Sequence, residues 1–260
     1  MVAFTVDWLE PIFRWLHVVA GVMWIGHLWF FNFVNAQVAK TYDADSKKKV
    51  IPELMPRALY WFRWGAAWTW IFGVLLLGVV YYMQSNANLF DDAHRGMGAG
   101  AGTAIGLGIL VVGFLAYDVL WKLLGKQESA GAAISAVLAI GVALGLSSVF
   151  SARAVFIHLG ALFGTIMAGN VWMRIWPNQR RIIAAVKDGR APEAGWAAMA
   201  GLRSKHNTYM SVPLVFFMIS QHGSRELSYG WVGAAAVIVL GWAFTKLLFD
   251  KAATEAPKAF

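Results

Sequence analysis

Long apolar runs recur along the whole chain, and they limit its fold more than any other feature of the sequence. There are about seven of them, each near the length of roughly 20 residues that a helix needs to cross a bilayer. Charged residues make up only 14% of the chain, whereas about 25% is usual for a soluble domain. The sequence therefore predicts an all-α fold, a polytopic membrane helix bundle. The predicted transmembrane helices are residues 11–34, 64–83, 101–121, 131–150, 154–176, 208–222 and 229–249.

Two of these runs need a further argument. The run at 208–222 is short and contains Pro213, but neighbouring helices can satisfy the backbone groups that a membrane proline frees. The run at 11–34 is too long for the core of a signal peptide, and Asp7 and Glu10 precede it in place of a basic segment. We therefore expect both runs to be transmembrane helices of the mature protein.

Lysine and arginine residues concentrate in three connections, at residues 37–61, 122–126 and 177–206. Because cytoplasmic loops carry an excess of these residues, the pattern predicts an N-terminus outside and a C-terminus in the cytoplasm. Residues 1–260 then form a single transmembrane domain with cytoplasmic loops 37–61 and 177–206. Within the second loop, two short amphipathic helices are expected on either side of a break at 189–192. We expect such a protein in a bacterial inner membrane.

The net charge of +8 does not indicate a nucleic-acid-binding protein. The basic residues lie in short connections between apolar runs, and not on an aromatic-rich soluble surface. Their expected partner is the lipid bilayer, whose cytoplasmic leaflet is anionic. The chain has no cysteine, which excludes disulfides, thiolate metal sites and a haem attached through a CxxCH motif within this chain.

Two histidines, His17 and His158, fall inside the first and fifth predicted helices. Both helices begin outside in the predicted topology, so the two residues lie at similar depths. Ionisable residues inside a membrane usually face the interior of a bundle and mark a site. A pair of imidazoles at matching depth predicts one b-type haem, with His17 and His158 as axial ligands of its iron. For either residue alone, a hydrogen bond to a neighbouring helix is the simpler alternative.

Small and aromatic residues share the faces of these two helices. Gly21 and Trp24 lie on the face of the first helix that carries its histidine, and Thr165 and Gly169 lie on the corresponding face of the fifth. We expect these four residues to line the haem. The glycines could admit the flat face of a porphyrin, or they could let two helices pack closely.

Charged residues also lie near the ends of the predicted helices. Arg14 and Arg153 are near the outer ends of the first and fifth, where they could pair with haem propionates. As interfacial residues they would need no such role. Asp118 lies four residues before Lys122, which predicts a local ion pair, with proton uptake as the alternative.

A second haem has a candidate ligand pair in His27 and His206, which fall toward the predicted cytoplasmic side. His27 follows His17 by ten residues, a rotation of roughly 80° around the helix, so the two cannot face one porphyrin squarely. An unpaired imidazole in hydrocarbon is costly, which favours the second haem. A helix cap or a headgroup contact explains His206 equally well.

Three stretches of the sequence carry a resemblance to a known family. They are RWLHVVAGVMWIG at residues 14–26, RAVFIHLGALFGTIMAGNVWMRIWPNQRR at 153–181 and SKHNTYMSVPLVFFMISQH at 204–222. Together they resemble the membrane-bound urate oxidase N-terminal domain family, over nearly the whole chain and in the same order. The resemblance implies a membrane domain that normally precedes a cytochrome c, oxidises urate and passes the electrons to that haem.

The sequence departs from this family pattern in two ways. It stops shortly after its last predicted helix and has no CxxCH motif, so we expect any cytochrome c to be a separate chain. His27 is a suspected second departure, because better-known members carry a small or apolar residue there. The first function expected is therefore a membrane haem b redox protein that passes electrons from urate or a similar small reductant to an external cytochrome c or respiratory chain. The alternative is a non-catalytic haem-bearing or purely structural subunit of a larger respiratory membrane complex.

No catalytic residue can be assigned from the sequence, but a planar anion such as urate would need donors and an aromatic surface. Candidates are the KHNTY segment at 205–209, together with Asn170 and Asn178. Helix capping is the alternative for Asn207 and Thr208. Paired carboxylates, a nucleophile elbow, a P-loop and a zinc signature are missing from the sequence, which argues against hydrolase and nucleotide-driven functions.

Overall fold

The computed structural model describes residues 2–83, 88–220 and 230–254 of the chain. These residues are helical apart from short connections, and no strand occurs among them. The predicted all-α membrane bundle is therefore confirmed. Its long helices are α1 (Val2–Trp29), α3 (Ala44–Leu77), α4 (Ala99–Leu123), α5 (Glu128–Ser147), α6 (Ala152–Asn170), α8 (Ala194–Ile219) and α9 (Gly230–Thr254).

Three π-helical turns extend these helices. They are η1 (Phe30–Asn35), which joins α1 to α2 (Ala36–Val38), η2 (Gly78–Tyr82), which ends α3, and η3 (Val171–Ile175), which joins α6 to α7 (Trp176–Lys187). A π turn has a wider repeat than an α-helix, so it rotates the residues that follow it, and such turns are frequent at functional sites. Tyr82 and Arg174, which make two of the main polar contacts of the interior, both lie in π turns.

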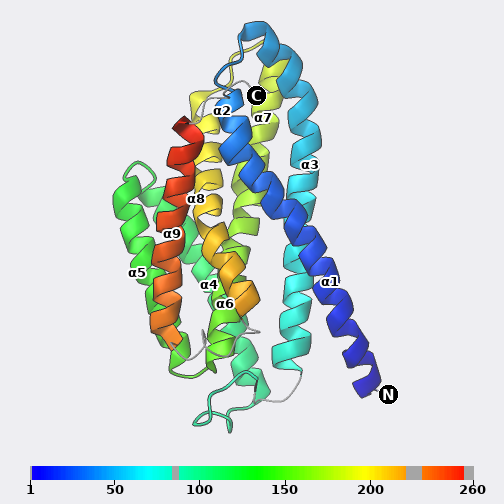
Figure 1. Cartoon of the computed structure of the whole chain (residues 1–260), viewed down its shortest axis with the longest axis vertical. Helices are drawn as coiled ribbons and strands as arrows, with labels where there is room; N and C mark the ends of the chain where they lie inside the picture. The colour runs from blue at the N-terminus through cyan, green and yellow to red at the C-terminus, as the bar shows by residue number, and fades with distance from the viewer. Residues whose placement is uncertain (1, 84–87, 221–229, 255–260) are drawn as a thin grey trace.

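Six continuous helical segments of the described chain are long and apolar enough to cross a membrane. The remaining predicted transmembrane helix, 208–222, forms the second half of α8 as far as the described residues reach. α8 is polar in its first half, and it packs among α6, α7 and α9 (Figure 1). It continues through Pro213, which is buried against Gly241 of α9. With α8 as the seventh, the predicted number of about seven helices is confirmed.

Successive long helices run in opposite directions, so the start of α1 and the end of α9 lie at opposite ends of the bundle (Figure 1). The connections at 39–43, 124–127 and 188–193 lie at the same end as the last turn of α9. These connections fall in or beside the three basic segments, which an alternating bundle must place on one side. The compartment that this side faces stays a prediction.

Most of the segment 37–61, which was expected to be a loop, is helical. α3 begins at Ala44 because the Asp43 carboxylate accepts a hydrogen bond from the Ser46 backbone N–H at 2.7 Å and caps the helix. The same hydrogen bond holds the pKa of Asp43 below its ordinary value. α3 thus starts well before the apolar run at 64–83, because its N-terminal turns are stabilised by the cap and not by burial.

The predicted break in the segment 177–206 is confirmed. α7 ends at Lys187, α8 begins at Ala194, and Gly189 between them has a φ of +71°, a left-handed conformation that glycine adopts without strain. The second amphipathic helix is not a short separate element, however. It is the first half of α8 and continues directly into the apolar half of that helix.

α6 is the central helix of the bundle, in contact with α3, α4, α5, α8 and α9. Residues 154–160 are all buried, including His158. Large apolar side chains on the outer faces of α1, α3, α4 and α9 are exposed instead, as expected for surfaces that contact lipid. The protein is an integral membrane protein whose polar groups are concentrated around α6.

The orientation can be tested by cysteine labelling, because the native chain has no cysteine. Lys48 and Asp92 are both exposed; Lys48 lies in the N-terminal turns of α3, and Asp92 lies beyond the opposite end of the α3–η2 helix. We expect a membrane-impermeant maleimide to label Asp92→Cys in intact cells. The same reagent should label Lys48→Cys only after the cells are permeabilised. The opposite pattern would reverse the predicted topology.

Candidate functional site

A large, mostly apolar cavity lies between α1, α3, α6 and α8, and exposed side chains such as Val22 and Ile219 on its lining open it to the outer surface of the bundle. Its volume is about 650 Å³. Ligand pockets in proteins typically have volumes of about 300–1,000 Å³, so this cavity is large enough for a small molecule or a cofactor. The predicted site residues that line it are Arg14, His17, Gly21, Trp24 and Thr165.

His17 lies at the cavity wall with its ring held against α3. Its Nδ1 is 2.8 Å from the backbone oxygen of Thr69, to which it donates its proton, so that Nε2 is the unprotonated ring nitrogen. Gly73 makes room for the ring, since a Cβ there would lie 3.0 Å from His17 Cε1. Metal-binding histidines usually donate their other ring N–H in this way. The arrangement of His17 therefore suits an axial ligand.

Other predicted residues supply walls and polar groups to the cavity. Trp24 is 1% exposed, and its indole N–H finds no hydrogen-bond partner in the described part of the chain. Thr165 accepts a hydrogen bond from Trp70 Nε1 at 3.1 Å. The Arg14 guanidinium is paired with Glu10 in the preceding helical turn. Trp24 thus offers a buried donor to a ligand that carries an acceptor.

His158 is completely buried, but it is not among the described residues that line the cavity. Its Nδ1 donates to the backbone oxygen of Ala154 at 2.7 Å, and its Nε2 accepts the hydroxyl proton of Tyr82 at 2.8 Å. Gly106 of α4 covers the same nitrogen, since a Cβ there would lie 2.6 Å from it. Both ring nitrogens of His158 are occupied by protein groups, and the structure does not bring His158 and His17 to one cavity.

Gly169 and Arg153 also lie away from the cavity. A Cβ on Gly169 would be 2.3 Å from a ring carbon of Phe114, so this glycine lets α6 pack against α4, which was the alternative interpretation. Arg153 is exposed in the first turn of α6. The structure thus gathers part of the predicted haem site around His17 and places the rest of it against α4 or at the surface.

The two histidines of the candidate second haem have separate partners. His27 Nδ1 lies 2.7 Å from the backbone oxygen of Met23, on its own helix. His206 lies against α4, with Nδ1 2.8 Å from the Tyr117 hydroxyl and its ring centroid 3.9 Å from that of Trp121. These contacts give no support to His27 and His206 as a ligand pair.

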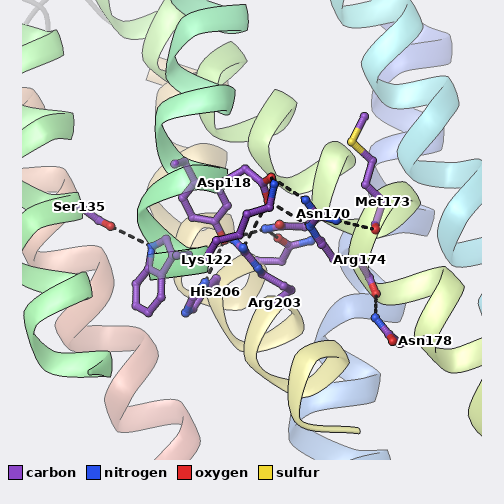
Figure 2. A network of polar contacts seen from close by, with 12 residues as sticks. Asp118, Lys122, Ser135, Asn170, Met173, Arg174, Asn178, Arg203 and His206 are labelled. Carbon is purple, nitrogen blue, oxygen red and sulfur yellow. Dashed lines mark hydrogen bonds and ion pairs between the residues drawn. The ribbon is translucent and has the colours of Figure 1, made fainter. Parts of the chain in front are cut away.

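A cluster of charged and polar side chains lies where α4, α6, η3 and α8 meet (Figure 2). At its centre, the Asp118 carboxylate accepts hydrogen bonds from Arg174 at 3.0 Å on Oδ1 and 2.6 Å on Oδ2. Lys122 Nζ lies 2.9 Å from Oδ2, which confirms the predicted local ion pair. Arg203 Nη2 lies 3.3 Å from Oδ1. We call this set the Asp118 cluster, and its members are Tyr117, Asp118, Lys122, Asn170, Arg174, Arg203, His206 and Asn207.

Tyr117 connects these ion pairs to a chain of amides. Its hydroxyl accepts a hydrogen bond from Asn170 Nδ2 at 2.9 Å and donates one to His206 Nδ1. Asn170 Nδ2 is also 2.9 Å from Asn207 Oδ1, and Asn207 Nδ2 donates to the backbone oxygen of Met167 at 3.0 Å. Both asparagines are completely buried. The cluster is therefore a polar site inside an otherwise apolar bundle.

Comparison with known proteins assigns the chain to a family. The family model described as urate oxidase N-terminal matches residues 3–49 and 42–259. The chain belongs to the urate oxidase N-terminal family. No curated protein and no solved structure gives a significant match. The resemblance in the sequence is thus confirmed at the level of the family.

In this urate oxidase N-terminal domain, the residues proposed from the sequence for urate do not all lie at one site. Asn178 donates to the backbone oxygen of Arg174 at 2.7 Å, Thr208 donates to that of Ser204, and the Tyr209 ring stacks on Phe249. Asn170, His206 and Asn207 belong to the Asp118 cluster. Lys205 instead pairs with Glu128 at 2.7 Å, and both side chains are about half exposed. The capping alternative for Asn207 is wrong, because α8 begins at Ala194 and continues past it.

The sequence reasoning missed Arg174 and Arg203 as site residues of this family member. Arg203 was expected only as one of the basic residues that set the orientation, whereas the structure directs both arginines to Asp118. Arg174 reaches it from the π turn η3, which no apolar pattern predicts. Asp118 itself was the available signal, because an acid inside an apolar run needs cationic partners from other helices.

The cavity and the Asp118 cluster are neighbours along α6 and α8. On α6, Thr165 lines the cavity and Asn170 belongs to the cluster, which is a helical rise of about 7.5 Å. On α8, Leu214 and Asn207 are separated by a rise of about 10 Å. The two sites therefore lie one to two helical turns apart along the same helices.

Proposed function

We propose that this protein is a membrane haem b redox protein that passes electrons from urate or a similar small reductant to an external cytochrome c or respiratory chain. The observation that carries the proposal is His17, whose Nε2 is left unprotonated at the wall of an apolar cavity of about 650 Å³. Membership of the urate oxidase N-terminal family supports urate as the reductant.

The residues around the cavity fit such a cofactor. His17 supplies a neutral imidazole, Gly21 leaves space beside it, and Trp24 offers an unpaired N–H to a buried acceptor. When bound, a b-type haem supplies an iron that accepts and releases one electron. The proposal takes His17 as the protein ligand and leaves out His158, because His158 Nε2 accepts the Tyr82 hydroxyl proton.

Protein groups around the cavity orient His17 and supply an apolar, positively charged environment. The Thr69 carbonyl fixes the tautomer and the orientation of His17, so that the lone pair of Nε2 is available to a metal. The apolar walls exclude water and strengthen electrostatic interactions within the cavity. Arg14, which lines the same cavity, supplies a cation that can pair with a haem carboxylate.

An absorption spectrum tests the cofactor. Protein purified after expression with ample haem should show a Soret band, and His17→Ala should lose nearly all of it because the axial ligand is removed. His94→Ala is the matched control, since His94 pairs with Asp91 in a connection outside the cavity, and its band should be unchanged. A wild-type protein without a Soret band, or His17→Ala with the full band, would contradict the proposal.

A second measurement tests the reductant. Urate added without dithionite should convert the oxidised haem spectrum of the wild type to the reduced one. A haem that dithionite reduces and urate does not would favour the alternative, a non-catalytic haem-bearing subunit of a larger respiratory membrane complex.

A further inference from the structure

Arg203 is a charged side chain with too few partners. It is completely buried, and its one hydrogen bond to a carboxylate, from Nη2 to Asp118 Oδ1, is long at 3.3 Å. Nε and Nη1 find no hydrogen-bond partner in the described residues. A buried guanidinium with unmet N–H groups is costly unless something else satisfies it.

The charge of Arg203 is also poorly compensated. Asp118 is the acid of the cluster, and its two oxygens already accept closer contacts from Arg174 and Lys122, at 2.6–3.0 Å. Three cations thus share one carboxylate. Water could satisfy unmet N–H groups but carries no charge, so the excess positive charge favours an anion.

Asn170 has an unmet hydrogen-bond acceptor, whereas Arg203 has unmet donors. Its Oδ1 is buried and finds no hydrogen-bond partner among the described residues, although its Nδ2 has two. Arg203 and Asn170 both contact Tyr117, since the Arg203 guanidinium lies 5.0 Å from the centre of the Tyr117 ring and Asn170 donates to the hydroxyl. The side chain with unmet donors and the side chain with an unmet acceptor therefore both contact Tyr117.

The three cationic side chains around Asp118 become less exposed from the surface of the bundle toward its interior. The Lys122 side chain is 55% exposed, that of Arg174 is 27% exposed and that of Arg203 is fully buried. An anion that approaches this end of the bundle meets positive charge first at the surface and then inside. Such an arrangement raises the local concentration of anions.

We infer that Arg203 and Asn170 form a buried binding site for a small anion that carries both hydrogen-bond acceptors and an N–H or O–H donor. The acceptors meet the Arg203 N–H groups, and the donor meets Asn170 Oδ1. Heterocyclic amide anions such as urate and hydrogen-bearing oxyanions such as bicarbonate share this chemistry. The inference stands on the Asp118 cluster and does not require the proposed haem. If the anion is urate, the cluster holds the reductant of the proposed function.

The test is a titration of the purified full-length protein in detergent, with the melting temperature as the signal, because a ligand that binds the folded state stabilises it. Urate, bicarbonate and nitrate are compared at constant ionic strength. We expect saturable stabilisation by urate or bicarbonate, roughly tenfold tighter than by nitrate, which has no donor for Asn170 Oδ1. Tighter urate binding identifies a heterocycle site, and tighter bicarbonate binding an oxyanion site.

Four variants make the titration specific. Arg203→Met should abolish binding of all three anions, and Arg203→Lys, which keeps the charge, should retain part of it. Asn170→Leu should remove the preference over nitrate. Lys246→Gln is the matched control, since Lys246 pairs with Asp250 on the exposed face of α9, and it should bind like the wild type.

Two outcomes would overturn the inference. One is a wild type with no saturable response to any of the three anions. The other is a wild-type affinity in Arg203→Lys combined with a wild-type affinity in a second variant, either Arg203→Met or Asn170→Leu. If Arg203→Met fails to fold, Arg203→Lys and Asn170→Leu are sufficient for the test. His17→Ala separates this test from the proposed function, because it should remove the Soret band and leave the anion affinity unchanged.

Discussion

Replacing Asp118 with asparagine should lower the free energy of unfolding by about 3–5 kcal/mol, because removing one partner of a buried ion pair leaves the other charge uncompensated. Asp118 is the carboxylate on which Arg174 and Arg203 converge, and the Arg203 side chain is completely buried. Asparagine keeps the size of the side chain, removes its charge and replaces one acceptor oxygen by an N–H donor. The effect therefore measures the loss of charge and hydrogen bonding, and not the loss of packing.

The measurement is urea unfolding in a mild detergent, followed by circular dichroism. Glu128→Gln is the control, because the Glu128–Lys205 pair is about half exposed on both sides and such pairs contribute less than about 1 kcal/mol. If both variants lose the same small amount, the Asp118 cluster does not contribute a buried ion pair, and the account of its charges fails.

Replacing Gly106 with alanine should destabilise the protein by about 2 kcal/mol or more. The added Cβ would lie 2.3 Å from the Tyr82 hydroxyl oxygen and 2.6 Å from His158 Nε2, so it would break the hydrogen bond between them. Overpacking alone typically costs about 1–3 kcal/mol, and the freed, completely buried His158 adds a desolvation penalty.

Gly108→Ala is a control on the same helix with the opposite expected sign. Nothing lies within 4 Å of a Cβ at Gly108, so the substitution should be neutral or stabilise α4 by up to about 1 kcal/mol through helix propensity. Unfolding of the two variants in the same detergent compares them directly. Equal stabilities would mean that Tyr82 and His158 do not meet over Gly106.

The sequence by itself determined the class of fold and the apolar, membrane-crossing part of every long helix, but not where α3 and α8 begin. The apolar runs needed no tertiary information, because the thickness of a bilayer sets the length of a transmembrane helix. The break at Gly189 followed from glycine and proline chemistry. The sequence also indicated His17, because an imidazole within hydrocarbon points to a site.

The apolar pattern could not determine the rotation of each helix about its own axis. A helix that is apolar on nearly all sides has no strongly polar face to orient it. The sequence therefore indicated the depth of a residue in the membrane, but not the direction in which its side chain points. His17 and His158 were placed at similar depth, yet His17 lines the cavity while His158 turns to Tyr82 and Gly106. Gly169, on the same helix as His158, packs against α4 for the same reason.

The Asp118 cluster shows the same limit for polar residues. The sequence placed Asp118, Asn170 and Arg203 on three different helices, and only tertiary packing brought them together. A π turn in η3 rotates Arg174 toward Asp118. The polar half of α8 enters the bundle because Arg203 and Asn207 find polar partners on α4 and α6. Composition and spacing determine which segments cross the membrane, whereas packing between helices decides which side chains meet, because that depends on rotations that a uniformly apolar surface leaves free.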